Sequence, residues 1–97
     1  QKATLEYEQY VSQSKLEINQ AKRQLADAQH QFETAQLAQQ QAKEVLRIRT
    51  NRFKEGLEKT TDLLMAETQY AQMKLAYYQS IFAYNMAQST LTFLLKN

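Results

Sequence analysis

The sequence of 97 residues has no cysteine, no proline and no tryptophan, and Gly56 is its single glycine. Without cysteine, a disulfide framework and a thiolate metal site are both excluded. Without proline, and with one glycine, the chain has almost no residue that interrupts a helix or makes a turn. It is also shorter than most domains that bury a deep core alone. Long helices are therefore favoured over a compact α/β domain.

The net charge is small, and the sequence shows no targeting signal. The formal net charge is only +2 at pH 7, which is too small to indicate nucleic acid or an anionic membrane as a partner. The first residues contain no apolar run of the signal-peptide type. We therefore expect either a cytoplasmic protein or a piece of a longer mature chain, and the features below favour the second.

Residues 2–54 follow the 3-4 spacing of a coiled-coil helix. In the middle of this heptad stripe alanine recurs at every seventh position, at Ala21, Ala28, Ala35 and Ala42. The other members are Thr4, Tyr7, Val11, Ser14, Ile18, Leu25, Phe32, Gln39, Leu46, Arg49 and Phe53. Small residues at a seam let two helix axes come close, which predicts tight antiparallel packing. At about 1.5 Å per residue, this helix would be roughly 80 Å long.

The one strong break lies around Gly56, because glycine easily adopts the left-handed conformation that follows a helix end. Thr60, Thr61 and Asp62 are suitable residues for the start of a new helix. A turn as short as residues 55–59 between two long helices makes an antiparallel hairpin. We therefore predict an all-α chain, a single helical hairpin over 1–97, with helices over about 2–54 and 60–96.

The second helix carries two apolar stripes, both with 3-4 spacing. The first stripe consists of Leu63, Ala66, Tyr70, Met73, Tyr77, Ser80, Tyr84, Ala87, Leu91 and Leu94. The second stripe consists of Leu57, Thr61, Leu64, Thr68, Ala71, Leu75, Tyr78, Phe82, Asn85 and Ser89. One partner needs only one stripe, so two stripes imply neighbours on two sides. The hairpin supplies one neighbour, and we expect it to be part of a larger α-barrel or bundle.

No motif for chemistry stands out. His30, with Asp27 and Glu33 nearby, would need a second such unit and further carboxylates to hold a metal, so a solvated histidine is expected. The basic residues between Lys43 and Lys54 are interleaved with acidic and apolar ones, as at a solvated helix end. The tyrosines of the second helix fit packing better than base stacking. We expect no enzyme activity, no metal, no cofactor and no nucleic acid.

An uncharged run over residues 75–95 raises the alternative of a transmembrane span. The run contains Gln79, Asn85, Gln88 and several hydroxyl side chains, and it is amphipathic rather than evenly apolar. Burial against protein neighbours explains it better.

The residues around the turn are more specific. The segments 52–57 (Arg-Phe-Lys-Glu-Gly-Leu) and 62–66 (Asp-Leu-Leu-Met-Ala) resemble the tip motif of the TolC-type outer-membrane efflux family. The spacing of alanine, tyrosine and leucine further along also resembles the closing helix of that family, as does the ending Leu-Leu-Lys-Asn. The resemblance covers about residues 45–97 and looks most like the second of the family's two internal repeats.

The resemblance implies a homotrimeric, passive export duct in the cell outer membrane, of the kind used by tripartite efflux pumps and type I secretion. This chain would be a hairpin of its periplasmic α-barrel. Glu55, Gly56 and Leu57 would form the tip that docks a periplasmic adaptor protein, which connects the duct to an inner-membrane transporter. Glu55 departs from the valine common in the family, which points to a different adaptor.

The resemblance also implies candidate residues for gating of the channel. These are Phe53, Glu58 and Asp62, which lie close to the tip. Glu58 stands where one half of the family can carry an arginine.

The alternative function is a structural or interaction hairpin, such as a cytoplasmic scaffold, with no role in transport. A scaffold needs neither the second stripe nor the tip motif.

Overall fold

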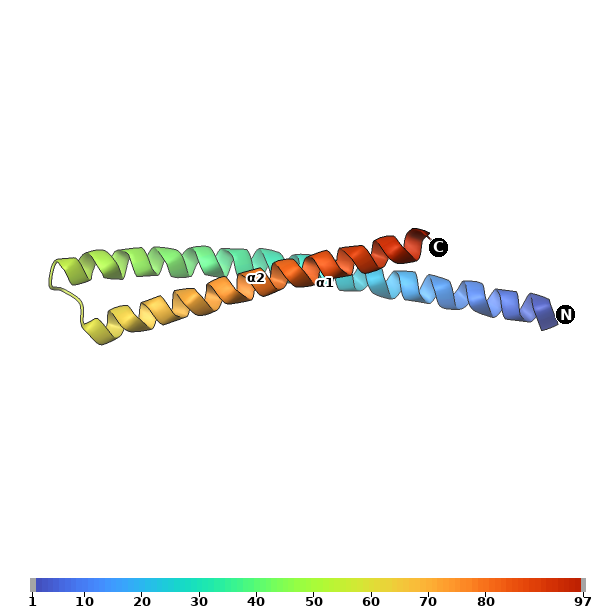
Figure 1. Cartoon of the computed structure of the whole chain (residues 1–97), viewed down its shortest axis with the longest axis horizontal. Coiled ribbons are helices and arrows are strands. Elements are labelled where there is room, and N and C mark those ends of the chain that lie inside the picture. Colours follow the sequence, from blue (N-terminus) through green and yellow to red (C-terminus); the bar gives the residue numbers. More distant parts are fainter. Residues whose placement is uncertain (1, 97) are drawn as a thin grey trace.

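The computed structural model describes residues 2–96 and contains two helices and no strand in that range. Helix α1 covers Lys2–Lys54 and helix α2 covers Thr60–Lys96. Residues 55–59 form the turn, and α2 runs back along α1 (Figure 1). The predicted all-α fold with two long helices in a hairpin is confirmed.

The hairpin is a thin rod with extents of 81 × 18 × 13 Å. Its length agrees with the value expected for a helix that continues without interruption to Lys54. The N-terminal part of α1 extends beyond the end of α2 (Figure 1). In this part Tyr7 is 68% exposed, so the heptad stripe of α1 has no covering helix there.

The core between the helices consists mainly of small side chains. The buried residues are Ala21, Ala28, Ala42 and Ala66, together with Ser80. Ala35 is half-buried, and no large side chain is fully buried among the described residues. The predicted alanine seam is therefore correct, and it yields close contact along the rod rather than a deep core.

Larger side chains of the first stripe pack against α1 around Phe32. The Phe32 ring lies 5.6 Å from the Tyr77 ring and 6.1 Å from the Tyr84 ring, measured between centroids. The two tyrosines are seven residues, about two helical turns, apart on α2, and the phenylalanine packs between them. Between them Ser80 is buried, and its hydroxyl donates to the carbonyl of Tyr77 at 2.6 Å. Each of the ten members of the first stripe is at least half-buried.

The second stripe faces away from α1. Ala66 of the first stripe and Leu75 of the second are nine residues apart, about two and a half helical turns, which places them on opposite sides of α2. Ala66 is 7% exposed, whereas Leu75 is 58% and Phe82 69% exposed. All ten members of the second stripe are exposed. The hairpin thus covers one face of α2 and leaves an opposite apolar face open.

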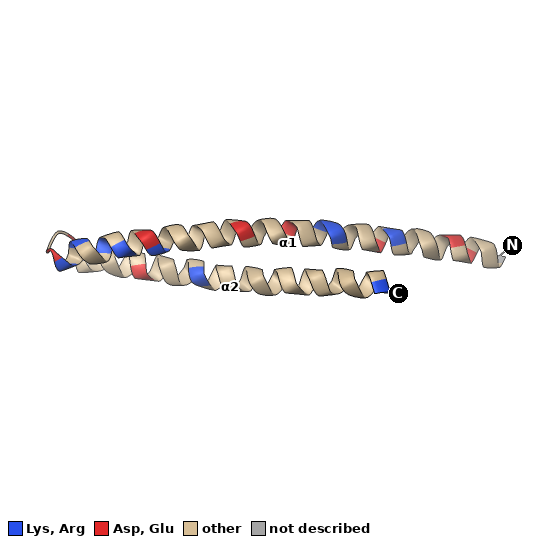
Figure 2. Cartoon of the chain, turned by 90° about the horizontal axis from the view of Figure 1, so that it is seen from above, with Lys and Arg blue, Asp and Glu red and all other residues tan. Residues whose placement is uncertain are grey.

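The two helices also differ in charge. Acidic and basic residues are distributed along most of α1, whereas α2 carries none between Lys74 and Lys96 (Figure 2). The open face of α2 therefore continues into a long uncharged surface that α1 does not have.

Candidate functional site at the hairpin tip

The turn is closed by a hydrogen-bonding pattern that requires its glycine. The Leu57 amide donates to the carbonyl of Arg52 at 2.8 Å, and the Gly56 amide donates to that of Phe53 at 3.0 Å. This pair of bonds is the Schellman motif, which uses a left-handed residue just past the helix end. Gly56 has a φ of +75°, as the motif demands. The helix break predicted at Gly56 is therefore confirmed, and the positive φ of this residue is its physical cause.

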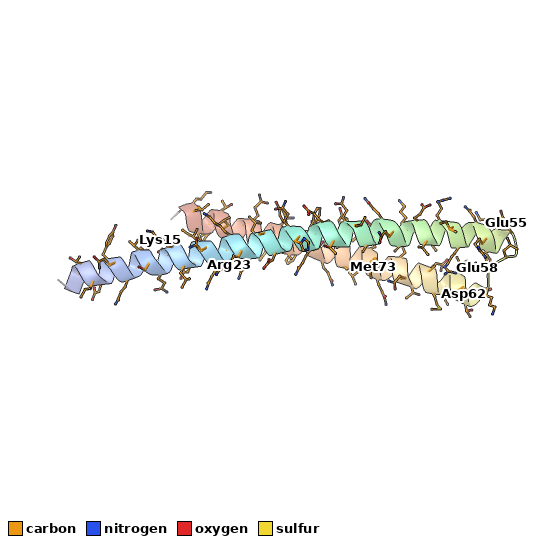
Figure 3. The ribbon with its side chains drawn as sticks, turned by 180° about the vertical axis from the view of Figure 1, so that it is seen from behind. Lys15, Arg23, Glu55, Glu58, Asp62 and Met73 are labelled. Carbon is orange, nitrogen blue, oxygen red and sulfur yellow. The ribbon has the colours of Figure 1, made fainter. Side chains whose placement is uncertain are left out.

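The motif leaves the side chain of Leu57 free. In a Schellman motif the residue in this place often makes an apolar contact with the last turn of the helix. Here the corresponding position of α1 is Arg52, and Leu57 is 65% exposed. Glu55 and Gly56 are exposed as well, and Glu55 lies at the extreme end of the rod (Figure 3). The three residues predicted to contact an adaptor are thus accessible together.

Glu58 ties the tip loop back to α1. Its carboxylate accepts a hydrogen bond from the Arg52 Nε at 2.9 Å and a second from Nη1 of Arg49. The Glu58 side chain is only 7% exposed, whereas the two arginine side chains are 42% and 55% exposed. A carboxylate held by two guanidinium groups loses little on burial, because charge-assisted bonds replace its hydration. Glu58 and these two arginines, which we call the tip clamp, fix the loop to the end of α1.

The predicted gating residues occupy different environments. Phe53, in the last turn of α1, is 40% exposed. Asp62, in the first turn of α2, is half-buried and suits the positive end of the helix dipole. Glu58 points into the tip clamp rather than away from the hairpin. The structure therefore ties Glu58 to Arg49 and Arg52 of α1.

Sequence reasoning missed the tip clamp. The sequence pattern assigns Arg49 to the heptad stripe, and Arg52 to the basic helix end and to the start of the tip motif, but it pairs neither arginine with Glu58. The sequence nevertheless contains a signal for the tip clamp, because a turn as short as residues 55–59 brings a loop glutamate back beside the last turns of α1. What could not be seen was which of the nearby acidic residues, Glu55 or Glu58, would reach the arginines.

A shallow hollow lies beside the tip clamp. Its volume is about 350 Å³, and its lining residues are Val45, Ile48, Arg49, Arg52 and Glu58. The two aliphatic side chains are 46% and 45% exposed. The α1 residues are spaced three and four apart and form one stripe that ends at the tip. This hollow combines an apolar floor with two guanidinium groups.

A second ion pair lies in α1 just before the arginines of the tip clamp. The Arg47 Nε donates to the Glu44 carboxylate at 3.0 Å. This hydrogen bond, and the positive charge of Arg47, lower the pKa of Glu44 below its ordinary value, while partial desolvation opposes the shift. The same pair raises the pKa of Arg47. Both side chains are more than half exposed, so the pair is a local helix contact.

No other centre for chemistry is found within residues 2–96. This range contains no group of three or more histidine, cysteine or carboxylate side chains that could hold a metal. His30 is exposed. Within the same residues, neither helix is apolar enough over a sufficient length to cross a membrane. The tip remains the part of the described chain with the most distinctive geometry.

Comparisons of this chain with models of protein families, with curated proteins and with solved structures find no match.

Proposed function

We propose that this chain is a hairpin of the periplasmic α-barrel of a TolC-type outer-membrane efflux duct. In this assignment the duct is a homotrimer and a passive conduit. Its tip docks a periplasmic adaptor that connects it to an inner-membrane transporter. The hairpin supplies walls and a docking end, and no catalytic group is needed.

The observation that carries the proposal is the open apolar face of α2. A barrel wall consists of helices that each pack against two neighbours, one on either side. Helix α2 has two stripes on opposite faces, and α1 covers only the first. A monomeric scaffold hairpin accounts for the first stripe and gives no reason for the second.

The geometry of the tip supports the same assignment. Leu57 extends from a rigid turn, and the tip clamp holds that turn on the end of α1. A docking end benefits from this rigidity, because less conformational freedom is lost on binding. The hollow next to the clamp would accept an aliphatic side chain beside a carboxylate from a helical adaptor.

The test is to express the complete polypeptide that contains this hairpin in a Gram-negative host. Its membrane location and its oligomeric state after detergent extraction are then measured. An outer-membrane trimer supports the duct. A cytoplasmic monomer or dimer rejects it and favours the scaffold hairpin.

Adaptor docking is tested separately in the same complete protein. Leu57→Glu places a charge at the tip and should abolish co-purification of the cognate adaptor while the trimer remains intact. Leu5→Glu, at a similarly exposed leucine near the other end of α1, is the matched control. Loss of adaptor binding in both variants, or in neither, would contradict docking at the tip.

A further inference from the structure

We propose that the second stripe of α2 binds the second stripe of another copy of this same chain, with the two α2 helices antiparallel. In this pair the Glu67 of each copy faces the Lys74 of the other. The inference concerns the 97-residue chain outside the duct, because in the proposed duct a neighbouring barrel helix would cover the second stripe instead.

The second stripe is suited to a dry helix contact. Leu64, Leu75 and Tyr78 are 59%, 58% and 55% exposed, and no charged residue interrupts the stripe. Thr68 has its hydroxyl bonded to the carbonyl of Leu64 at 3.0 Å, so it presents mainly its methyl group. Ala71 is small and permits close approach. An exposed apolar surface of this length favours association.

Two charged residues on one flank of the stripe suggest which partner fits it. Glu67 and Lys74 are seven residues apart and occupy the same heptad position beside the stripe. When two identical helices run antiparallel, this position of one meets the same position of the other. An acidic and a basic residue one heptad apart are therefore complementary to themselves, and two ion pairs form by symmetry.

These charges also select one alignment. When Thr68 lies opposite Ala71 of the second copy, each Glu67 faces a Lys74. A shift by one heptad in one direction brings the two Glu67 side chains together, and a shift in the other direction brings the two Lys74 side chains together. Like charges at this position are unfavourable, so both neighbouring alignments are disfavoured.

Asn85 disfavours the alignments that are shifted further. An overlap that extends to the C-terminal half of α2 would place the Asn85 amide opposite Thr68 or Leu75 of the second copy. A buried amide without a partner costs free energy, and the Thr68 hydroxyl is already bonded to its own helix. The preferred alignment ends before Asn85 and leaves that amide in water.

Contacts within one chain compete only weakly with the proposed pairing of Glu67 and Lys74 between two copies. The Lys74 ammonium lies 5.8 Å from the centre of the Tyr70 ring of its own helix, an exposed contact that a modest rotation would exchange. Glu67 is exposed, and it takes part in no salt bridge among residues 2–96. Helix α1 lies on the other side of α2, so it does not obstruct the second copy.

Charge reversal tests the pair in the purified chain, with sedimentation equilibrium as the measurement. Glu67→Lys or Lys74→Glu alone should weaken dimerisation about tenfold, since two attractive contacts become repulsive. The double variant with both changes should recover the original affinity, and an equimolar mixture of the two single variants should form heterodimers. Glu33→Lys on α1 is the matched control and should have no effect.

The alignment is tested by disulfide formation, which is unambiguous because the chain has no native cysteine. A mixture of Thr68→Cys and Ala71→Cys chains should cross-link under mild oxidation. A mixture of Thr68→Cys and Asn85→Cys chains reports the competing alignment and should not. A chain that remains monomeric, or single charge variants that dimerise like the original, would overturn the proposal. Cross-linking of only the second mixture would overturn the alignment. None of these results depends on whether the parent protein is a duct.

Discussion

The Glu58 carboxylate accepts a hydrogen bond from the Arg52 guanidinium at 2.9 Å, and this contact joins the tip loop to the last turn of α1. The two residues are six positions apart with the turn between them. Their ion pair acts on the same short segment as the Schellman motif. The backbone bonds set the direction of the chain after Gly56, and the ion pair holds the loop in that direction.

We expect Glu58→Ala to loosen the tip and to lower the free energy of unfolding by about 1–2 kcal/mol, since two charge-assisted hydrogen bonds to a nearly buried carboxylate are lost. Hydrogen exchange of the amides of residues 55–59 measures the local effect. Glu55→Ala changes the same residue type at an exposed place in the same loop and should have no such effect. Equal exchange rates in the two variants would show that the clamp does not hold the loop.

We expect Gly56→Ala to destabilise the hairpin by about 1 kcal/mol through backbone strain alone. An added Cβ would meet no heavy atom within 4 Å, so no steric clash contributes. Gly56→Asn should cost less, because asparagine tolerates a positive φ better than alanine does. Thermal unfolding of the two variants gives the comparison. A larger loss for asparagine than for alanine would mean that backbone conformation does not determine the cost.

We expect Ala28→Leu to push the helices apart and to destabilise the hairpin by about 1–3 kcal/mol, because Ala28 is 8% exposed in the alanine seam. Ala26→Leu adds the same atoms at an exposed place on α1, and it should leave stability nearly unchanged. Urea unfolding followed by circular dichroism measures both. Similar losses in both variants would show that close approach of the helices at this seam is not required.

Much of the hairpin could be predicted from the sequence because its information is periodic and local. The stripe around Ala28 and the first stripe around Tyr77 follow from 3-4 spacing, and Gly56 marks the turn. The side-chain contacts of the tip could not be predicted in this way. Whether Glu58 or Glu55 reaches Arg49 and Arg52 depends on the path of five loop residues in space. The second stripe by itself records only that a neighbour is needed, and the proposal of a second copy rests on Glu67 and Lys74 beside it.

The ion pair of Glu44 and Arg47 should make a small contribution to stability that depends on pH. The pKa of Glu44 is lowered in the folded chain, chiefly by the hydrogen bond from Arg47. Its contribution is therefore present above the unfolded pKa, which is about 4.3, and is lost as the pH falls through the lower folded pKa. The melting temperatures of the original chain and of Glu44→Gln should differ slightly at about pH 6 and converge at about pH 2. A difference that grows at low pH would contradict this sign.

Asn85 offers a test of how the proposed duct opens. It is the one amide in the second stripe, and it is exposed in the isolated hairpin. If opening requires hairpins to shift against each other, an amide in that contact weakens packing and permits the shift. In the complete channel, Asn85→Leu should raise thermal stability and lower the conductance measured in planar bilayers. Gln88→Leu, which changes an exposed amide outside the stripe, should do neither. Unchanged conductance in an Asn85→Leu channel that is more stable would show that this contact does not control opening.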